Sequence, residues 1–131
     1  MSAGGIVGRH LAVGTGSAAA GGIITQLDVS GLRPGSKVLI EQSAVSLAPA
    51  AAAGIVQLYG IYTTDGTAPT AVNGTKFLNS RVYAPSSGAV VSAPGGAFQV
   101  TVGAAGRVRA ITYSNELWYR PDMTEMIMRQ G

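Results

Sequence analysis

Side chains that could perform acid–base or metal chemistry are few in this chain, and they are scattered. The chain has one histidine and no cysteine, and His10 has no second histidine or carboxylate near it in the sequence. The acidic residues are Asp28, Glu41, Asp65, Glu116, Asp122 and Glu125. A zinc site needs several ligands together, and acid–base catalysis needs groups within hydrogen-bond reach. The sequence therefore predicts no catalytic, metal-binding or cofactor-binding residues, and we expect that the chain is not an enzyme.

Two glycine-rich segments, residues 14–17 and 103–106, could suggest phosphate-binding loops. Neither follows the spacing GxxxxGK[ST], and neither opens a strand–helix–strand unit, which such loops require. The basic residues are dispersed as well, although the net charge is +3. They form no run that would neutralise a row of phosphates, and the aromatic residues do not alternate with them. We therefore expect neither a nucleotide cofactor nor a nucleic-acid partner.

The composition suggests a surface that is poor in charge. Charged residues make up 11% of the chain and hydrophobic residues 47%, whereas soluble domains are about 25% charged. One interpretation is that neighbouring subunits cover much of the surface, and the other is a weakly charged β-domain with Ser and Thr outside. The most apolar window, residues 44–59, is broken by Pro49 and Gly54 and is shorter than the ~20 residues that span a bilayer. We expect no membrane partner.

The body of the chain alternates apolar and polar residues with a period of two, which is typical of β-strands. About seven or eight such strands, spaced 8–12 residues apart and separated by Gly/Pro/Ser turns, predict an all-β fold: an antiparallel β-sandwich or jelly-roll-like barrel. Ile23 and Thr25 share one face of the first strand. Gln42 lies on the apolar face of the second, and Phe98 on the core side of the sixth. The predicted strands are residues 23–29, 37–47, 55–63, 77–83, 89–92, 97–102 and 107–113.

Both ends of the chain read as flexible arms on a sandwich that spans residues 23–116. Residues 1–22 are rich in Gly and Ala, and such a segment loses much backbone entropy when it becomes ordered. Residues 117–131 form the other arm, in which Asp122 could cap a short helical turn through Glu125. The apolar side chains of this arm either contact another subunit or pack back over the open end of the domain.

Association should use apolar, aromatic and arginine side chains. The predicted strand 55–63 is apolar on both faces, so both faces need cover. Arg107 and Arg109 should project from one face of their strand, opposite Thr112 and about 7 Å apart. They should share an anionic partner, a carboxylate of a neighbouring chain or of this domain, unless both are simply solvated. The predicted interface residues are Arg9, Ile55, Tyr59, Ile61, Arg107, Arg109, Trp118, Tyr119, Met123, Met126, Ile127 and Met128.

Three stretches carry a resemblance to a known group of proteins. They are residues 24–32 (ITQLDVSGL), residues 36–41 (SKVLIE), and residues 95–103 (GGAFQVTVG) running into 106–114 (GRVRAITYS). In style they resemble the small β-sandwich virion proteins of tailed bacteriophages, which serve as head decoration (cement) subunits, fibres and tail accessories. The resemblance implies a structural virion protein, assembled in the host cytoplasm, that stabilises the particle by binding itself and other virion proteins such as the major capsid protein. A homo-oligomer, for example a trimer, is the expected state.

A carbohydrate- or receptor-binding module of a phage fibre or tail is the alternative. Trp118, Tyr119, Tyr59 and Tyr62 could stack on sugar rings if they lie together on an open face. A decoration subunit would instead hide these aromatic residues in protein contacts.

Overall fold

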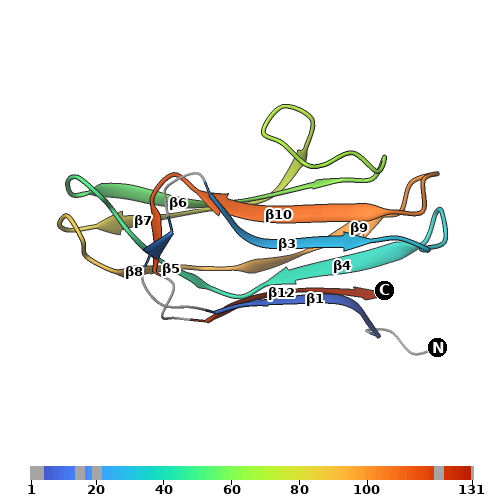
Figure 1. The fold of residues 1–131 in the computed structure, drawn as a ribbon, viewed down its shortest axis with the longest axis horizontal. Helices are drawn as coiled ribbons and strands as arrows, with labels where there is room; N and C mark the ends of the chain where they lie inside the picture. Colours follow the sequence, from blue (N-terminus) through green and yellow to red (C-terminus); the bar gives the residue numbers. More distant parts are fainter. Residues whose placement is uncertain (1–4, 14–16, 19–21, 120–122, 131) are drawn as a thin grey trace.

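A computed structural model describes residues 5–13, 17–18, 22–119 and 123–130. Within these residues the chain forms β-strands joined by turns and loops (Figure 1). The strands are β1 (Ile6–Ala12), β2 (Ser17–Ala18), β3 (Ile23–Val29), β4 (Lys37–Gln42), β5 (Val45–Ala48), β6 (Gly54–Thr63), β7 (Thr75–Ala84), β8 (Val91–Ala93), β9 (Gly96–Thr101), β10 (Val108–Ser114), β11 (Leu117–Tyr119) and β12 (Thr124–Gln130).

The strands make a two-layer antiparallel sandwich, which confirms the predicted fold class. One layer is the sheet β3–β10–β6–β7. The other layer consists of two sheets, β1–β12–β4–β9 and β2–β11–β5–β8. These two sheets continue one another end to end. Each strand of one sheet is next in the chain to the strand at the same place in the other sheet: β1 to β2, β12 to β11, β4 to β5 and β9 to β8. Figure 1 shows the two layers lying over each other along the long axis.

Alternation along the strands sets the two faces of each layer. In β10, Val108 and Thr112 are fully buried, whereas Arg109 and Tyr113 are half-buried on the outer face. The prediction that Ile23 and Thr25 share one face is wrong: a shift of register between Thr112 and Tyr113 places Ile23 opposite Tyr113. Ile23 is therefore 50% exposed on the outer face.

The prediction of arms outside the sandwich is wrong for the described parts of both end segments. Residues 6–12 and 124–130 pair with each other as β1 and β12, and β12 also pairs with β4. The prediction of Met126 and Met128 at an interface is wrong: both are fully buried in the core, since alternate residues of β12 face it. The proposed helical turn through Glu125 is wrong for the same reason. These segments order because the strand pairing satisfies their backbone groups and the core takes their apolar side chains.

The interior holds two apolar clusters with a buried polar group between the layers. One cluster includes Val45, Leu47 and Leu58, and the other includes Ile40 and Met126. The polar group consists of Thr25, Gln42, Thr112 and Thr124, each at most 4% exposed. These four residues come from β3, β4, β10 and β12 and connect the two layers by hydrogen bonds.

Candidate functional site

Arg107 and Arg109 share a carboxylate, as the sequence predicted, and it belongs to this domain. Arg109 lies opposite Asp28 in the pairing of β10 with β3. Arg107 holds Asp28 with two hydrogen bonds, from Nε to Oδ1 at 2.7 Å and from Nη2 to Oδ2 at 2.6 Å. Nε of Arg109 lies 3.4 Å from Oδ2 of Asp28, and its Nη1 donates to the carbonyl of Gly66 at 3.2 Å. The two arginines are thus engaged within the chain, where they brace the start of the connection between β6 and β7.

This pairing should make part of the folding stability depend on pH. The hydrogen bonds from Arg107 lower the pKa of the Asp28 carboxyl below its usual value, and the charges of Arg107 and Arg109 act in the same direction. A depressed folded-state pKa gives stabilisation that is complete above the unfolded-state pKa and is lost as pH falls through the folded-state pKa.

We expect Asp28→Asn to lower the melting temperature by roughly 3 °C near neutral pH, a modest effect because the pair is partly exposed and screened. The difference should shrink as pH falls from neutral through the lowered folded-state pKa of Asp28, because the wild-type carboxyl then becomes protonated. Thermal melts followed by circular dichroism across this range test the prediction. An equal difference at both ends of the range would contradict it.

Aromatic and apolar side chains occupy the centre of the same outer face. Tyr59 stacks on Tyr113 with ring centroids 5.0 Å apart, and Nζ of Lys76 lies 5.2 Å from the centre of the Tyr59 ring. The Tyr59 hydroxyl donates to Oε1 of Gln57 at 2.5 Å. Ile55, which was also predicted at an interface, is 42% exposed. The structure therefore brings Ile55 and Tyr59 onto one face with the two arginines.

The connection between β6 and β7, residues 64–74, folds over part of this face and stands above the upper layer in Figure 1. Ile61 lies beneath it and is 2% exposed, so this predicted interface residue is covered by the chain itself. The connection is held by its own polar groups. Oδ1 of Asp65 accepts from the backbone and the hydroxyl of Thr67 at 3.0 and 2.6 Å. Oδ1 of Asn73 accepts a backbone N–H at 2.7 Å.

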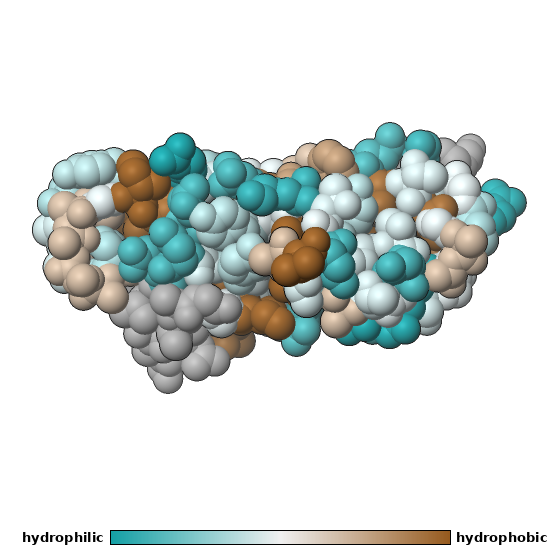
Figure 2. All heavy atoms as spheres, turned by 90° about the horizontal axis from the view of Figure 1, so that it is seen from above, coloured by the Kyte–Doolittle hydropathy of each residue, from teal (hydrophilic) through white to brown (hydrophobic). Residues whose placement is uncertain are grey.

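An apolar hollow of about 230 Å³ opens beside this connection. We call it the notch, and it is lined by Ile23, Ile61, Ala71, Ile111 and Tyr113. Val72 follows Ala71 directly and is 95% exposed. Figure 2 looks down on this side of the molecule and shows hydrophobic residues near the middle of a mostly hydrophilic face.

The outer face of the opposite layer carries ion pairs instead. Arg9, a predicted interface residue, pairs with Glu125, and Nε of Arg129 lies 2.6 Å from Oε1 of Glu41. Ile127 lies directly opposite Arg9 in the pairing of β1 with β12 and is half-buried. This face therefore combines an apolar centre with charges that are already paired.

The remaining predicted residues lie at the start of the C-terminal segment. Met123 is 68% exposed. Trp118 and Tyr119 belong to β11, which pairs with β2 and β5. The side chains of Trp118 and Tyr119 lie outside what the structure describes.

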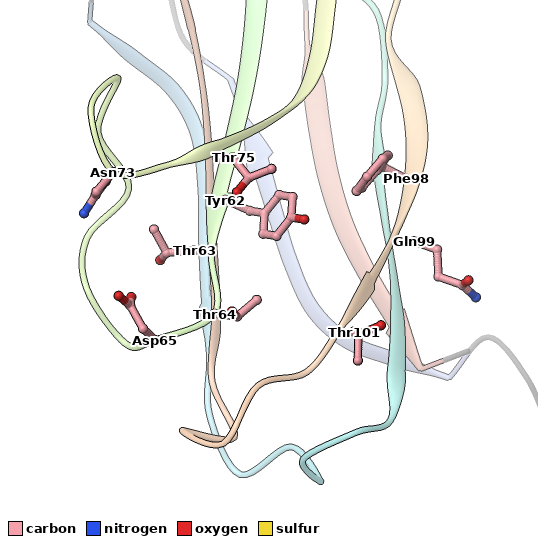
Figure 3. A pocket seen from close by; sticks show the side chains of 9 residues that line it. All are labelled: Tyr62, Thr63, Thr64, Asp65, Asn73, Thr75, Phe98, Gln99 and Thr101. Carbon is pink, nitrogen blue, oxygen red and sulfur yellow. The ribbon is translucent and has the colours of Figure 1, made fainter.

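A second, polar cleft of about 390 Å³ lies where the layers diverge, between β6 and β9 (Figure 3). The rings of Tyr62 and Phe98 stand 5.8 Å apart on its wall. Among the described residues, the hydroxyls of Tyr62, Thr64 and Thr75 have no hydrogen-bond partner, whereas Thr101 accepts from Lys37 at 2.6 Å. The complete lining is Tyr62, Thr63, Thr64, Asp65, Asn73, Thr75, Phe98, Gln99 and Thr101. Figure 3 shows the Gln99 side chain pointing away from the space beside Tyr62.

The described carboxylates are all engaged in contacts within the chain: Asp28, Glu41 and Glu125 with arginines, Asp65 with Thr67, and Glu116 with the backbone N–H of Ala50. In the described part of the chain, no three His, Asp or Glu side chains gather as metal ligands would. No helix there is both long and apolar enough to cross a membrane.

Comparison with known proteins supports the fold class and goes no further. The architecture is that of a β-sandwich of the jelly-roll type. A solved structure that shares it is that of Eiger TNF from S. frugiperda, with a TM-score of 0.55, 9% identity, and coverage of 97% of this chain and 93% of the other. No protein-family profile matches the chain, and no curated protein sequence matches it. At such low identity the likeness concerns the fold alone.

Sequence reasoning does not select Val72, Ala71 or Phe98 as site residues. Ala71 and Val72 lie in a turn-rich connection, where an apolar residue gives no signal of whether a neighbour covers it. Phe98 is predicted in the core, and its ring does lie against Tyr62 and Phe77. It is nevertheless 37% exposed, because the cleft opens beside it.

Proposed function

We propose that the chain is a structural virion protein: a decoration or cement subunit that stabilises a bacteriophage particle by binding itself and the coat. The observation that carries this proposal is the exposure of apolar side chains on a sandwich whose described carboxylates all have contacts within the chain. Val72, Ile23 and Tyr83 are 95%, 50% and 60% exposed. Exposed apolar groups that gather on one face favour a protein–protein contact. The resemblance of residues 23–114 to small phage virion proteins supplies the setting.

The distribution of charge supports a subunit that binds through apolar contact. Asp28 and Glu125 are each held by arginines of the same chain, so neither has to find a partner elsewhere. Burying such neutralised pairs beside apolar groups costs less than burying lone charges. Apolar area then supplies the free energy of association.

Particle purification tests this proposal. Phage particles recovered from cells that make the chain should carry it in many copies through a density gradient, as quantified by mass spectrometry against the major coat protein. Deletion of the gene should give particles that open at lower temperature or lower salt. Particles that lack the chain and resist heat equally well with and without its gene would overturn the proposal.

The polar cleft favours a second candidate function, that of a glycan-binding module of a fibre or tail. Tyr62 and Phe98 offer aromatic surface for the apolar face of a sugar ring, and the hydroxyls of Thr64 and Thr75 can donate to and accept from sugar hydroxyls. A concave site with aromatic surface and a few convergent polar groups is the usual form of a small-ligand site. No charged group other than Asp65 lines the cleft, so a neutral sugar fits it best.

If this second function holds, Phe98→Leu should weaken glycan binding about tenfold, because a stacked ring contributes on the order of 1 kcal/mol. Leucine keeps apolar packing against Tyr62 and so preserves the fold. A microarray of bacterial surface glycans, followed by calorimetry with the best binder, measures the effect. Tyr83→Leu is the control, since this exposed tyrosine lies at the far end of β7. Equal affinity of both variants would exclude the cleft.

A further inference from the structure

We propose that two copies of this chain dimerise about a two-fold axis, with Val72 of each copy inserted into the notch of the other. The inference rests on the proposed function in so far as that function requires self-association. It adds the surface and the partner, and it names one residue as the protrusion and five as its receptor.

The protrusion is Val72, whose side chain is 95% exposed. The turn that carries it is held in place, because the Thr70 hydroxyl and backbone N–H both donate to Oδ1 of Asn73, at 2.9 and 2.7 Å. The Gly74 N–H closes the turn on the carbonyl of Thr70 at 2.9 Å. An apolar side chain presented on a braced turn loses little entropy when it docks.

The receptor is the notch, with a volume of about 230 Å³ and no charged residue in its lining. A water molecule occupies about 30 Å³ in the liquid, so the notch has room for a valine side chain. Ile23, Ile111 and the Tyr113 ring, which are exposed or half-buried, would lose water on contact with Val72, and this loss is the favourable term in most protein association. Lys76 does not oppose this contact, because its ammonium lies over the Tyr59 ring.

The protrusion and the receptor lie side by side, which selects the symmetry. Ala71 lines the notch, and Val72 is the next residue. A two-fold interface is self-complementary: what one copy offers, the other must receive at the same place. A two-fold axis beside residues 71 and 72 forms both Val72 contacts at once.

The face that surrounds these groups approaches the size that a stable dimer uses. A sheet of four strands is about 19 Å wide. Its strands have seven residues in β3 and β10 and ten in β6 and β7, which makes them about 23 to 33 Å long, so the sheet presents roughly 500 Å² of projected area. A typical interface buries about 800 Å² on each partner. The 64–74 connection covers part of this sheet face but adds its own exposed sides, so the two together approach that range.

The first arm of the test changes the protrusion. Wild-type chain should sediment as a dimer at micromolar concentration, and Val72→Asp should raise the dimer dissociation constant on the order of a hundredfold. Two apolar contacts are lost, and each is worth about a factor of ten. Val90→Asp is the control, since Val90 is 45% exposed in the turn at the other end of β7. A Val72→Asp chain that stays dimeric would overturn the inference, as would a monomeric or trimeric wild-type chain.

The second arm tests reciprocity. Ile111→Lys places a cation in the notch and should also give monomers, and Ala71→Lys does the same from an exposed position if Ile111→Lys disturbs the fold. A mixture of Val72→Asp and lysine-variant chains should recover a heterodimer. In it, the introduced aspartate of one chain meets the introduced lysine of the other, while Val72 of the second chain enters an unchanged notch. Failure of the mixture to associate would contradict insertion into the notch.

The outcomes separate this inference from the proposed function. A chain that is monomeric alone yet present in purified particles leaves the function standing and removes the dimer. A dimer that is absent from particles does the reverse.

Discussion

Gly95→Ala should unfold this protein or lower its free energy of unfolding by more than about 4 kcal/mol. A Cβ at Gly95 would lie 1.8 Å from the carbonyl oxygen of Gln42 and 2.7 Å from its carbonyl carbon. Ordinary contacts between carbon and oxygen are about 3.3 Å or longer. Both atoms of Gln42 belong to the backbone, so rotation of a side chain cannot relieve the clash.

The expected effect is large because of where this contact lies. Gly95 stands in the step from β8 to β9, and Gln42 ends β4 just before the step to β5. Gln42 is paired with Gly96 in the β4–β9 ladder. A shift that makes room for a methyl group must therefore separate β4 from β9 at the point where the two end-to-end sheets join. This separation breaks backbone hydrogen bonds in both sheets.

Urea denaturation of Gly95→Ala beside Gly54→Ala tests this prediction. Neither glycine has a positive φ, and a Cβ at Gly54 would meet nothing within 4 Å. Gly54→Ala should therefore stay within about 0.5 kcal/mol of the wild-type chain. A Gly95→Ala variant that is as stable as Gly54→Ala would mean that the backbone of Gln42 does not approach Gly95 so closely.

Much of the fold could be predicted from the sequence because strand periodicity is a local signal. The predicted faces of β4 and β10 are correct, including the inward positions of Gln42 and Thr112. The prediction for Ile23 is wrong because a register shift depends on how two strands align, and the sequence of one strand does not determine that alignment. The terminal segments are predicted as arms because glycines in residues 1–22 and Pro121 in residues 117–131 disfavour regular secondary structure. Their strand pairing is a contact between opposite ends of the chain.

The candidate site could be predicted only in part, for a similar reason. Two arginines spaced by two residues on a predicted strand favoured a shared anion, with two solvated arginines as the alternative, and that much followed from charge and geometry. The identity of the anion, Asp28, depended on the pairing of β10 with β3. The position of Val72 beside the notch depends on how the whole connection between β6 and β7 folds back over Ile61, and residue types within that connection give no measure of it.

Gln42→Ala should lower the free energy of unfolding by about 3–5 kcal/mol, which corresponds to a fall in melting temperature of about 10 °C or more. Gln42 is 4% exposed, and its amide joins the two layers. Oε1 accepts from the Thr25 hydroxyl at 2.8 Å. Nε2 donates to Oγ1 of Thr124 at 2.7 Å and to the carbonyl of Ser43 at 2.9 Å.

The hydroxyl protons have one consistent direction in this group. The Thr25 hydroxyl donates its one proton to Oε1 of Gln42, so in its contact with Thr112 the Thr112 hydroxyl is the donor and Oγ1 of Thr25 accepts. Oγ1 of Thr112 in turn accepts the backbone N–H of Thr25. Removal of the amide therefore leaves the buried Thr25 hydroxyl without its acceptor, and Oγ1 of Thr124 keeps only the Ser43 hydroxyl, at 3.1 Å. Each unsatisfied buried group costs about 1–3 kcal/mol, and the cavity left by the side chain adds to this cost.

Replacing Gln42 together with the two threonines that it bonds distinguishes the loss of hydrogen bonds from the loss of volume. Gln42→Leu alone fills the space but leaves the threonine hydroxyls unpaired, so it should remain clearly destabilised. Adding Thr25→Val and Thr124→Val removes the two hydroxyls that Gln42 bonded and should restore part of the stability, because exchange of both partners for apolar groups of similar shape is nearly neutral. Thr112 is kept because its Oγ1 accepts the buried backbone N–H of residue 25. Gln99→Ala, an exposed glutamine on β9, is the matched control and should stay within about 0.5 kcal/mol. If Gln42→Ala has the same melting temperature as Gln99→Ala, the layers are held by apolar packing alone, and the buried polar group between them does not stabilise the fold.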